Sequence, residues 1–165
     1  MTAPSSSPSP SSSSPLDRLA HVLAVWFGCG HVPVAPGLAG TLGAIPLYLV
    51  LRPLGLGAVA AATVAITAAG VWAGGVVERR LGRKDPQIVC IDEVAGVFVT
   101  WLCAPPTWKG LLAGVVLFRI FDQFKPWPCR LAERLRGGAG VMGDDVLAGL
   151  WGCAVLLLAR RLGWL

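Results

Sequence analysis

The chain has 165 residues, of which 55% are hydrophobic and 14% charged, and its formal net charge is +5 at pH 7. Typical soluble domains contain about 25% charged residues, so the composition argues against a water-soluble fold and favours a protein embedded in lipid. The positive charge suits anionic lipid head groups. Nucleic acid would also attract it, but no nucleic-acid-binding motif is present.

The N-terminal segment differs in composition from the rest. Residues 1–15 are almost entirely Ser and Pro, and such a segment cannot bury apolar surface. We therefore expect a disordered tail over residues 1–15, without the basic region of a secretory signal, and one helical domain over residues 16–165. The apolar spacing of residues 16–27 predicts a short amphipathic helix at the membrane interface.

A glycine-rich stretch, GCGHVPVAPGLAGTLG, occupies residues 28–43. Its glycines, with Pro33 and Pro36, predict an irregular loop that leads into a helix near Gly40 or Thr41, with Thr41 available as its cap. Such a loop presents free backbone N–H groups that suit phosphate. The signal is weak by itself, because a helix–helix connector has a similar composition and the P-loop GK[ST] is absent.

The next apolar segments have the lengths of membrane helices. Residues 42–51 are apolar and end at Arg52, and residues 54–77 contain no charge. Those 24 residues can cross a hydrocarbon core of about 30 Å. The basic cluster that follows is of the kind retained in the cytoplasm; it comprises Arg79, Arg80, Arg83 and Lys84.

Two adjacent carboxylates then occur inside an apolar segment. Asp85-Pro86 predicts a helix start, with Asp as N-cap and Pro in the first position, and the helix should run towards Cys103. This places Asp92 and Glu93 in an otherwise apolar helix. A buried carboxylate is costly unless it is paired, protonated or bound to metal.

The C-terminal third predicts two further apolar helices. Residues 108–124 form one, with Arg119 and Asp122 three residues apart on one face and Lys125-Pro126 after its end. Residues 137–140, GGAG, predict a flexible hinge. Asp144 and Asp145 then open a last helix over residues 146–159, which is short for a full membrane span.

The five cysteines form no CxxC pattern, so we expect small buried hydrophobic thiols in a reducing compartment. None has an Arg six residues later, which argues against a cysteine nucleophile.

Six of the nine acids lie in or at the ends of apolar helices: Asp85, Asp92, Glu93, Asp122, Asp144 and Asp145. If they converge, their repulsion calls for a divalent cation, and oxygen ligands favour Mg²⁺ or Mn²⁺ over Zn²⁺. With Arg119 and Lys125 nearby, such a site suits phosphate ester cleavage. Ion transport along acidic helices and purely structural ion pairs are the alternatives.

Four motifs appear in order: FGCGHVPVAPGLAGTLGAIP, IVCIDEVAG, FRIFDQFKPWP and GGAGVMGDDVLAG. With them the chain resembles the phosphatidylglycerophosphatase A family. The resemblance implies an all-helical, membrane-embedded bundle that removes the terminal phosphate of phosphatidylglycerophosphate with Mg²⁺, giving phosphatidylglycerol. Leu38 is a departure, because the family loop commonly has Thr there.

From the chemistry of these residues together with the resemblance, we expect the following roles. The expected Mg²⁺ ligands are Asp92, Glu93, Asp144 and Asp145. Asp92 and Asp122 are the expected catalytic residues, with Asp122 as a further ligand or the base for the attacking water. Substrate contacts are expected from Arg119, Lys125, Gly30, Gly37 and Thr41.

The expected partners are the lipid substrate and the bilayer, without nucleic acid. We expect a multi-pass protein of the cell (inner) membrane with its site facing the cytoplasm. A small helical membrane transport protein that uses intramembrane carboxylates is the alternative function.

Overall fold

The structure is a computed structural model that describes residues 14–164. Within that range it contains eight α-helices, two short 3-10 helices and no strand, which confirms the all-helical prediction. The expected disordered tail falls mostly on residues 1–13, which lie outside the described residues. In the described part of the chain, Ser14 caps the first helix and Pro15 is its first residue.

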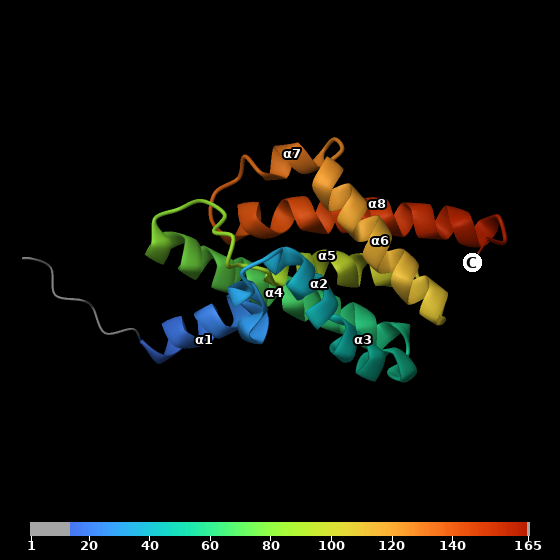
Figure 1. Cartoon of the computed structure of the whole chain (residues 1–165), viewed down its shortest axis with the longest axis horizontal. Helices are drawn as coiled ribbons and strands as arrows, with labels where there is room; N and C mark the ends of the chain where they lie inside the picture. Colours follow the sequence, from blue (N-terminus) through green and yellow to red (C-terminus); the bar gives the residue numbers. More distant parts are fainter. Residues whose placement is uncertain (1–13, 165) are drawn as a thin grey trace, which may run out of the picture.

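The helices form an elongated bundle (Figure 1). The bounds are α1 (Pro15–Ala24), α2 (Pro36–Gly43), α3 (Ile45–Leu51), α4 (Leu56–Leu81), α5 (Ile91–Trp101), α6 (Trp108–Phe124), α7 (Cys129–Ala132) and α8 (Gly138–Arg161), with 3-10 helices at Trp26–His31 and Arg52–Leu54. The long helices α4 and α8 follow the long axis, and α6 crosses α8 obliquely.

Three helical stretches of the described chain are long and apolar enough to cross a membrane: Pro36–Leu54, Leu56–Leu81 and Gly138–Arg161. At 1.5 Å per residue, the 26 residues of α4 extend about 39 Å and the 24 of α8 about 36 Å, against a hydrocarbon core of about 30 Å. The predicted span over residues 54–77 is confirmed. The expectation that the last helix is too short is wrong.

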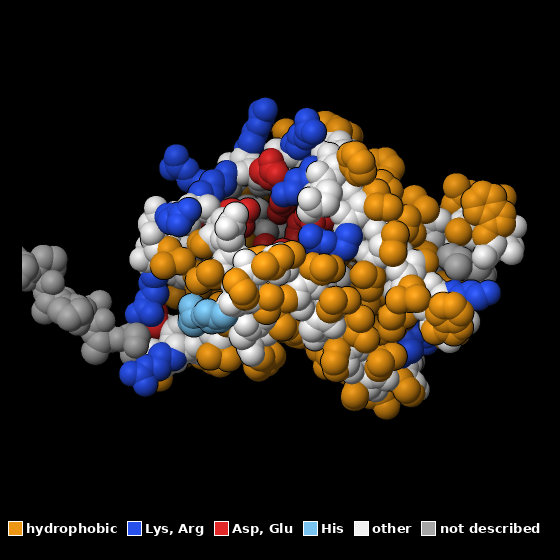
Figure 2. Space-filling model, viewed as in Figure 1, with side chains coloured by type: hydrophobic (Ala, Val, Ile, Leu, Met, Phe, Trp, Pro, Cys, Tyr) orange, Lys and Arg blue, Asp and Glu red, His pale blue; other side chains and the backbone are white. Residues whose placement is uncertain are grey.

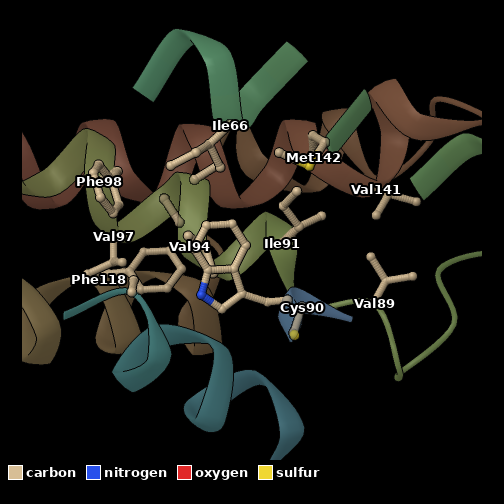
Figure 3. Close-up of a cluster of buried hydrophobic side chains, with 14 of the residues drawn as sticks. Ile66, Val89, Cys90, Ile91, Val94, Val97, Phe98, Phe118, Val141 and Met142 are labelled. Atoms are coloured by element: carbon tan, nitrogen blue, oxygen red, sulfur yellow. The ribbon is translucent and has the colours of Figure 1, made fainter. Parts of the chain in front are cut away.

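Helix α5 is the centre of the bundle. Each of its residues except Glu93 is buried, and it packs against α4, α6 and α8. Figure 3 shows Ile91, Val94 and Phe98 of α5 among side chains from those neighbours, such as Phe118 of α6 and Met142 of α8.

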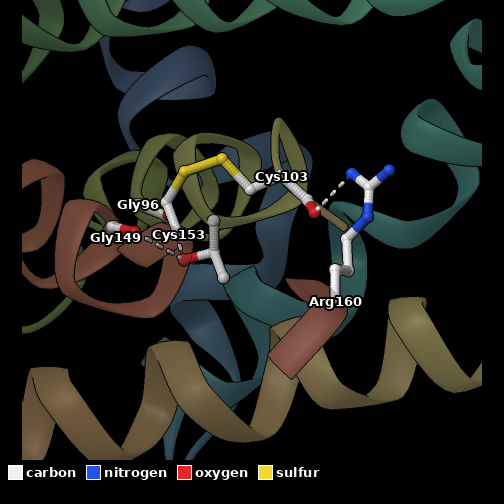
Figure 4. Close-up of a disulfide and its surroundings, with 6 residues drawn as sticks. Gly96, Cys103, Gly149, Cys153 and Arg160 are labelled. Atoms are coloured by element: carbon white, nitrogen blue, oxygen red, sulfur yellow. Dashed lines mark hydrogen bonds between the residues drawn. A yellow bond between two sulfur atoms is a disulfide. The ribbon is translucent and has the colours of Figure 1, made fainter. Parts of the chain in front are cut away.

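Helices α5 and α8 pack with their backbones in direct contact. A Cβ on Gly149 of α8 would lie 2.3 Å from the carbonyl oxygen of Gly96 in α5. The Thr100 hydroxyl donates to the Gly96 oxygen at 3.1 Å and to the Gly149 oxygen at 3.2 Å (Figure 4). In lipid, helix association depends on such close packing, because the lipid tails are as apolar as the side chains.

The predicted glycine hinge at residues 137–140 is wrong, because α8 begins at Gly138. A Cβ on Gly138 would lie 1.6 Å from the carbonyl oxygen of Val71 in α4. The glycine therefore permits close approach of two helices. Consequently Asp144 and Asp145 lie about two turns inside α8 rather than at its start.

The predicted starts of two other helices are also wrong. Helix α2 begins at Pro36, which suits a first helical position, so Thr41 lies inside the helix and does not cap it. Helix α5 begins at Ile91 rather than Pro86. The Cys90 N–H donates instead to the carbonyl oxygen of Ala24, at the end of α1, over 2.9 Å. This tertiary contact outweighs the local cap signal of Asp85-Pro86.

Two cysteines are joined rather than free. Cys103, beyond the end of α5, and Cys153 of α8 form a disulfide (Figure 4), so the expectation of free thiols is wrong for this pair. The cysteines lie 50 residues apart in the chain with Cα atoms 5.2 Å apart, a proximity that only the packing of α5 on α8 creates. Cys29, Cys90 and Cys129 are free.

Candidate functional site

The predicted acids converge on one cavity. It has a volume of about 580 Å³ and receives side chains from the start of α2, the segment before α5, and helices α5, α6 and α8. Its charged lining residues are Asp85, Asp92, Glu93, Arg119, Asp122, Lys125, Asp144 and Asp145. Figure 2 shows acidic side chains in a hollow in the upper part of this face, left of centre, with Lys and Arg side chains around it. We call this the acidic cavity.

Three carboxylates in the acidic cavity lie particularly close together. One oxygen each of Asp92, Glu93 and Asp145 lie within 4.8 Å of one another. Their proximity follows from the helix packing, because Gly96 and Gly149 occur one turn after Asp92 and Asp145 and bring the backbones into contact. Helices α5 and α8 run in the same direction there, so the acids project towards the same end.

This acidic triad is electrostatically unfavourable without a cation. Two unit charges 4.8 Å apart repel each other by about 3.5 kcal/mol at an effective dielectric constant near 20. Three such pairs exist when all three groups are ionised. Protonation or a bound cation must therefore offset the charge.

The described residues fit a divalent cation. The Glu93 Oε2 atom is buried and has no hydrogen-bond partner among residues 14–164. The other oxygen, Oε1, would lie 2.0 Å from a Cβ on Gly37, so the first turn of α2 presses against this carboxylate. An all-oxygen donor set of this kind suits a hard cation such as Mg²⁺ or Ca²⁺.

Asp144 lies outside the triad, although the sequence predicted it as a fourth metal ligand. Its Oδ2 atom accepts a hydrogen bond from Lys125 Nζ at 2.5 Å, and the same ammonium lies 2.9 Å from Glu133 Oε1. Burial would lower the pKa of Lys125, but the hydrogen bonds to Asp144 and Glu133 outweigh it and raise the pKa above its usual range. Lys125 therefore remains a cation at the cavity wall.

Arg119 and Asp122 lie on one face of α6, as the spacing predicts. Arg119 Nη1 is 3.1 Å from Asp122 Oδ2, which also accepts a hydrogen bond from Gln123 Nε2 at 3.0 Å. The ion pair lacks hydrogen-bond geometry, so the buried Nη1 has no acceptor within the described chain. An unsatisfied guanidinium N–H at a cavity is suited to an anion such as phosphate.

The glycine-rich segment contributes to the cavity only in part. Gly37 lines the cavity at the first turn of α2, where backbone N–H groups have no intrahelical acceptor. Gly30 and Thr41 lie outside the lining. A Cβ on Gly30 would lie 1.9 Å from the carbonyl oxygen of Ile88, so this glycine permits backbone packing. The Thr41 hydroxyl donates to the Gly37 oxygen within α2 at 3.0 Å.

Two polar residues at the cavity were not singled out from the sequence, Gln87 and Gln123. The only indication in the sequence that Gln123 lies at the site was its position next to Asp122. Asp85 was expected as the N-cap of the helix that carries Asp92, but it reaches the cavity from the loop before α5. Burial, followed by the charge of Asp144, raises the pKa of Asp85.

Comparison with known proteins gives consistent matches over most of the chain. The family described as "Phosphatidylglycerophosphatase A" matches residues 22–160. A Bacteroides thetaiotaomicron protein named "Putative phosphatidylinositol-3-phosphatase" is 42% identical over 143 residues, covering 81% of this chain and 89% of that protein. Proteins named "Phosphatidylglycerophosphatase A" from Escherichia coli and Haemophilus influenzae are 35% and 36% identical, covering 82% of this chain and 80% and 85% of their own lengths. No solved structure matches.

Proposed function

The chain belongs to the phosphatidylglycerophosphatase A family of lipid phosphatases, and from that premise we propose that it hydrolyses phosphatidylglycerophosphate to phosphatidylglycerol and phosphate with the help of Mg²⁺. The observation that carries the proposal is the acidic triad beside the free guanidinium N–H of Arg119 in one cavity. This combination suits a phosphate monoester and a divalent cation together.

Asp92, Glu93 and Asp145 would hold the Mg²⁺. When bound, the ion would offset negative charge on the phosphoryl oxygens and make a coordinated water more acidic. Asp144 is not assigned as a ligand, because its carboxylate is engaged by Lys125. Its role is to hold the Lys125 ammonium at the wall of the acidic cavity.

The cationic side chains bind and orient the phosphate. Arg119 donates from its free Nη1, Lys125 supplies a fixed positive charge, and the first turn of α2 at Gly37 offers backbone N–H groups. These groups, two from α6 and one from α2, then determine the position of the phosphorus atom relative to the carboxylates, and such fixed geometry lowers the barrier for attack.

Asp122 acts as the base. Arg119 and Gln123 hold its carboxylate in the cavity. It takes one proton from the attacking water as the new P–O bond forms. The bond between phosphorus and the glycerol oxygen breaks, and that oxygen receives the proton back from Asp122, so the products are phosphatidylglycerol and phosphate.

The acidic cavity would face the cytoplasm. Asp85 at its wall directly follows the basic cluster of Arg79, Arg80, Arg83 and Lys84 at the end of α4. Basic residues flanking a membrane helix are retained on the cytoplasmic side.

A second candidate substrate is an inositol phospholipid with a 3-phosphate. It is favoured by the 42% identity to the Bacteroides protein, whose name refers to that substrate. Both lipids present a phosphate monoester to the cavity, and the chemistry proposed above applies to either. A transport function is disfavoured, because the acids gather in one cavity rather than along the length of the bundle.

Phosphate release by the purified protein in detergent tests the proposal. Phosphatidylglycerophosphate and phosphatidylinositol 3-phosphate should be compared side by side, after EDTA treatment and after Mg²⁺ addition. We expect Mg²⁺-dependent release from phosphatidylglycerophosphate at the higher kcat/KM, and loss by about 100-fold or more in Asp92→Asn. Preferred release from the inositol lipid would identify the second candidate, and no release from either would refute both.

A further inference from the structure

A second cavity lies between α3 and α6 and is almost entirely apolar. Its volume is about 450 Å³. One wall comes from α3 and the other from the first half of α6; the lining residues are Ile45, Tyr48, Leu49, Arg52, Pro106, Thr107, Trp108, Leu111 and Leu112. The same two segments of chain, α2–α3 and α6, also form walls of the acidic cavity. We call the second cavity the α3–α6 groove.

The groove and the acidic cavity lie along one seam. On α6, Leu112 precedes Arg119 by seven residues, or two turns, so both side chains project from one helix face. The rise of 1.5 Å per residue separates them by about 10 Å, and Arg119 from Trp108 by about 16 Å. At the cavity end the two walls meet, because a Cβ on Gly37 would lie 3.3 Å from Arg119 Nη1.

The back of the groove is rigid. The Tyr48 ring lies with its centroid 4.4 Å from that of Trp101 in α5, and Trp101 Nε1 donates to the Leu111 carbonyl oxygen at 3.1 Å. These contacts fix one residue from each wall against the buried helix α5. The groove therefore exists before a ligand enters it, which lowers the entropic cost of binding.

We propose that the α3–α6 groove binds an acyl chain of the lipid whose phosphate occupies the acidic cavity. This rests on the proposed function, because it assumes a phospholipid substrate. The length agrees with the occupant: in phosphatidylglycerophosphate a glycerol and a phosphodiester separate the terminal phosphate from the acyl esters, and the rise of about 10 Å from Arg119 to Leu112 leaves room for this head group before the groove begins.

The groove positions the chain rather than supplying much binding energy. An acyl chain leaving the bilayer for an apolar groove exchanges one apolar environment for another, so little hydrophobic free energy is gained. Its contribution is orientation, because a chain held between α3 and α6 aligns the phosphate with the acidic triad. The groove should thus distinguish acylated from deacylated substrates.

Filling the groove tests this directly. In Leu112→Trp the larger ring would occupy the space of the chain. Leu150→Trp is the matched control, since the Leu112 side chain is 50% exposed and that of Leu150 on α8, outside the groove, is 52% exposed. Each variant is assayed on long-chain phosphatidylglycerophosphate and on its deacylated head group, which has no chain that could enter the groove.

We expect Leu112→Trp to lower kcat/KM for the long-chain lipid about 10-fold or more, with turnover of the deacylated head group within about 2-fold of the wild type. Leu150→Trp should change neither. Unchanged long-chain turnover in Leu112→Trp, or an equal loss on both substrates, would overturn the groove assignment. A wild type inactive on both substrates would instead refute the proposed function.

A cross-linking measurement is independent of turnover and of the folding of any variant. The wild type with Mg²⁺ is illuminated with a long-chain lipid that carries a photoactivatable acyl chain and a non-hydrolysable terminal phosphonate. We expect labels on Ile45, Leu49, Leu111 or Leu112, and much weaker labelling there by the matching phosphatidylglycerol probe. Equal labelling by the two probes would mean general contact with membrane lipid and would contradict the proposal.

Discussion

Replacing Asp145 by Asn should stabilise the protein when no divalent cation is bound. The three triad oxygens lie within 4.8 Å of one another, and each ionised pair costs about 3.5 kcal/mol at an effective dielectric constant near 20. Asp145→Asn removes two of the three pairs, which together repel by about 7 kcal/mol when all three groups are ionised. Proton uptake by one carboxyl relieves part of the repulsion in the wild type, and we expect a net gain of about 1–2 kcal/mol.

Asp144, next to Asp145, provides a matched control, because its substitution should change the stability in the opposite direction. Asp144→Asn removes the same charge from the same helix, but Asp144 accepts a hydrogen bond from Lys125. The amide oxygen of Asn can still accept, but the half-buried ammonium of Lys125 loses an anionic partner, and weakening such a charge-assisted bond costs up to about 1.5–3 kcal/mol. We therefore expect Asp144→Asn to lower the stability of the cation-free protein, whereas Asp145→Asn raises it.

Thermal unfolding of the purified proteins in detergent measures both effects. In EDTA the melting temperature should rise by about 2–8 °C in Asp145→Asn and fall in Asp144→Asn, at about 2–4 °C per kcal/mol. Added Mg²⁺ should raise the melting temperature of the wild type and of Asp144→Asn, but not of Asp145→Asn, because binding to the folded state alone stabilises it. A lower melting temperature of Asp145→Asn in EDTA would refute the reasoning about the triad.

Two further substitutions test other parts of the acidic cavity. Arg119→Lys keeps the positive charge but loses the planar guanidinium, which reaches both Asp122 and a phosphate oxygen. We therefore expect kcat/KM in a phosphate-release assay to fall about 10–100-fold, while the melting temperature changes little. Gly37→Ala would place a Cβ 2.0 Å from Glu93 Oε1; we expect the apparent affinity for Mg²⁺, read from the Mg²⁺ dependence of turnover, to weaken. The control is Gly57→Ala in α4, where a Cβ meets open space. This variant should leave the Mg²⁺ dependence of turnover unchanged. Equal behaviour of the two glycine variants would contradict the contact between Gly37 and Glu93.

Long apolar runs with clear end signals were predictable from the sequence. Helix α6 has the predicted bounds, Trp108–Phe124, because Thr107 caps its start and Lys125-Pro126 follows its end. Helix α4 was predictable from its charge-free length. The meeting of the acids was predictable for a different reason: carboxylates in apolar helices are too costly to remain apart from a partner.

Glycines were the main source of error. Residues 137–140 have the composition of a hinge, but Gly138 lies against the Val71 carbonyl of α4 inside a continuous helix. In a soluble protein such a run would break the helix, whereas in a membrane bundle it allows backbones to approach. The start of α2 was misplaced for a related reason, because glycines in residues 36–43 belong to a helix.

Features created by tertiary packing could not be read from the sequence. Asp144 and Asp145 are adjacent and chemically identical, and only the rotation of α8 in the bundle directs one to Lys125 and the other to Asp92 and Glu93. The Cys103–Cys153 disulfide depends in the same way on the packing of α5 on α8. The α3–α6 groove is likewise a product of how two separate segments are arranged around α5.

The central claim is that Asp92, Glu93 and Asp145, from two helices far apart in the chain, share one site for a divalent cation. Electron paramagnetic resonance of Mn²⁺ added to the purified protein in detergent tests it most directly, because bound and free Mn²⁺ give distinct signals. We predict bound Mn²⁺ in the wild type and in Asp144→Asn, displaced by excess Mg²⁺, and none in the variant that combines Asp92→Asn, Glu93→Gln and Asp145→Asn. Undiminished Mn²⁺ binding by that triple variant would contradict the claim.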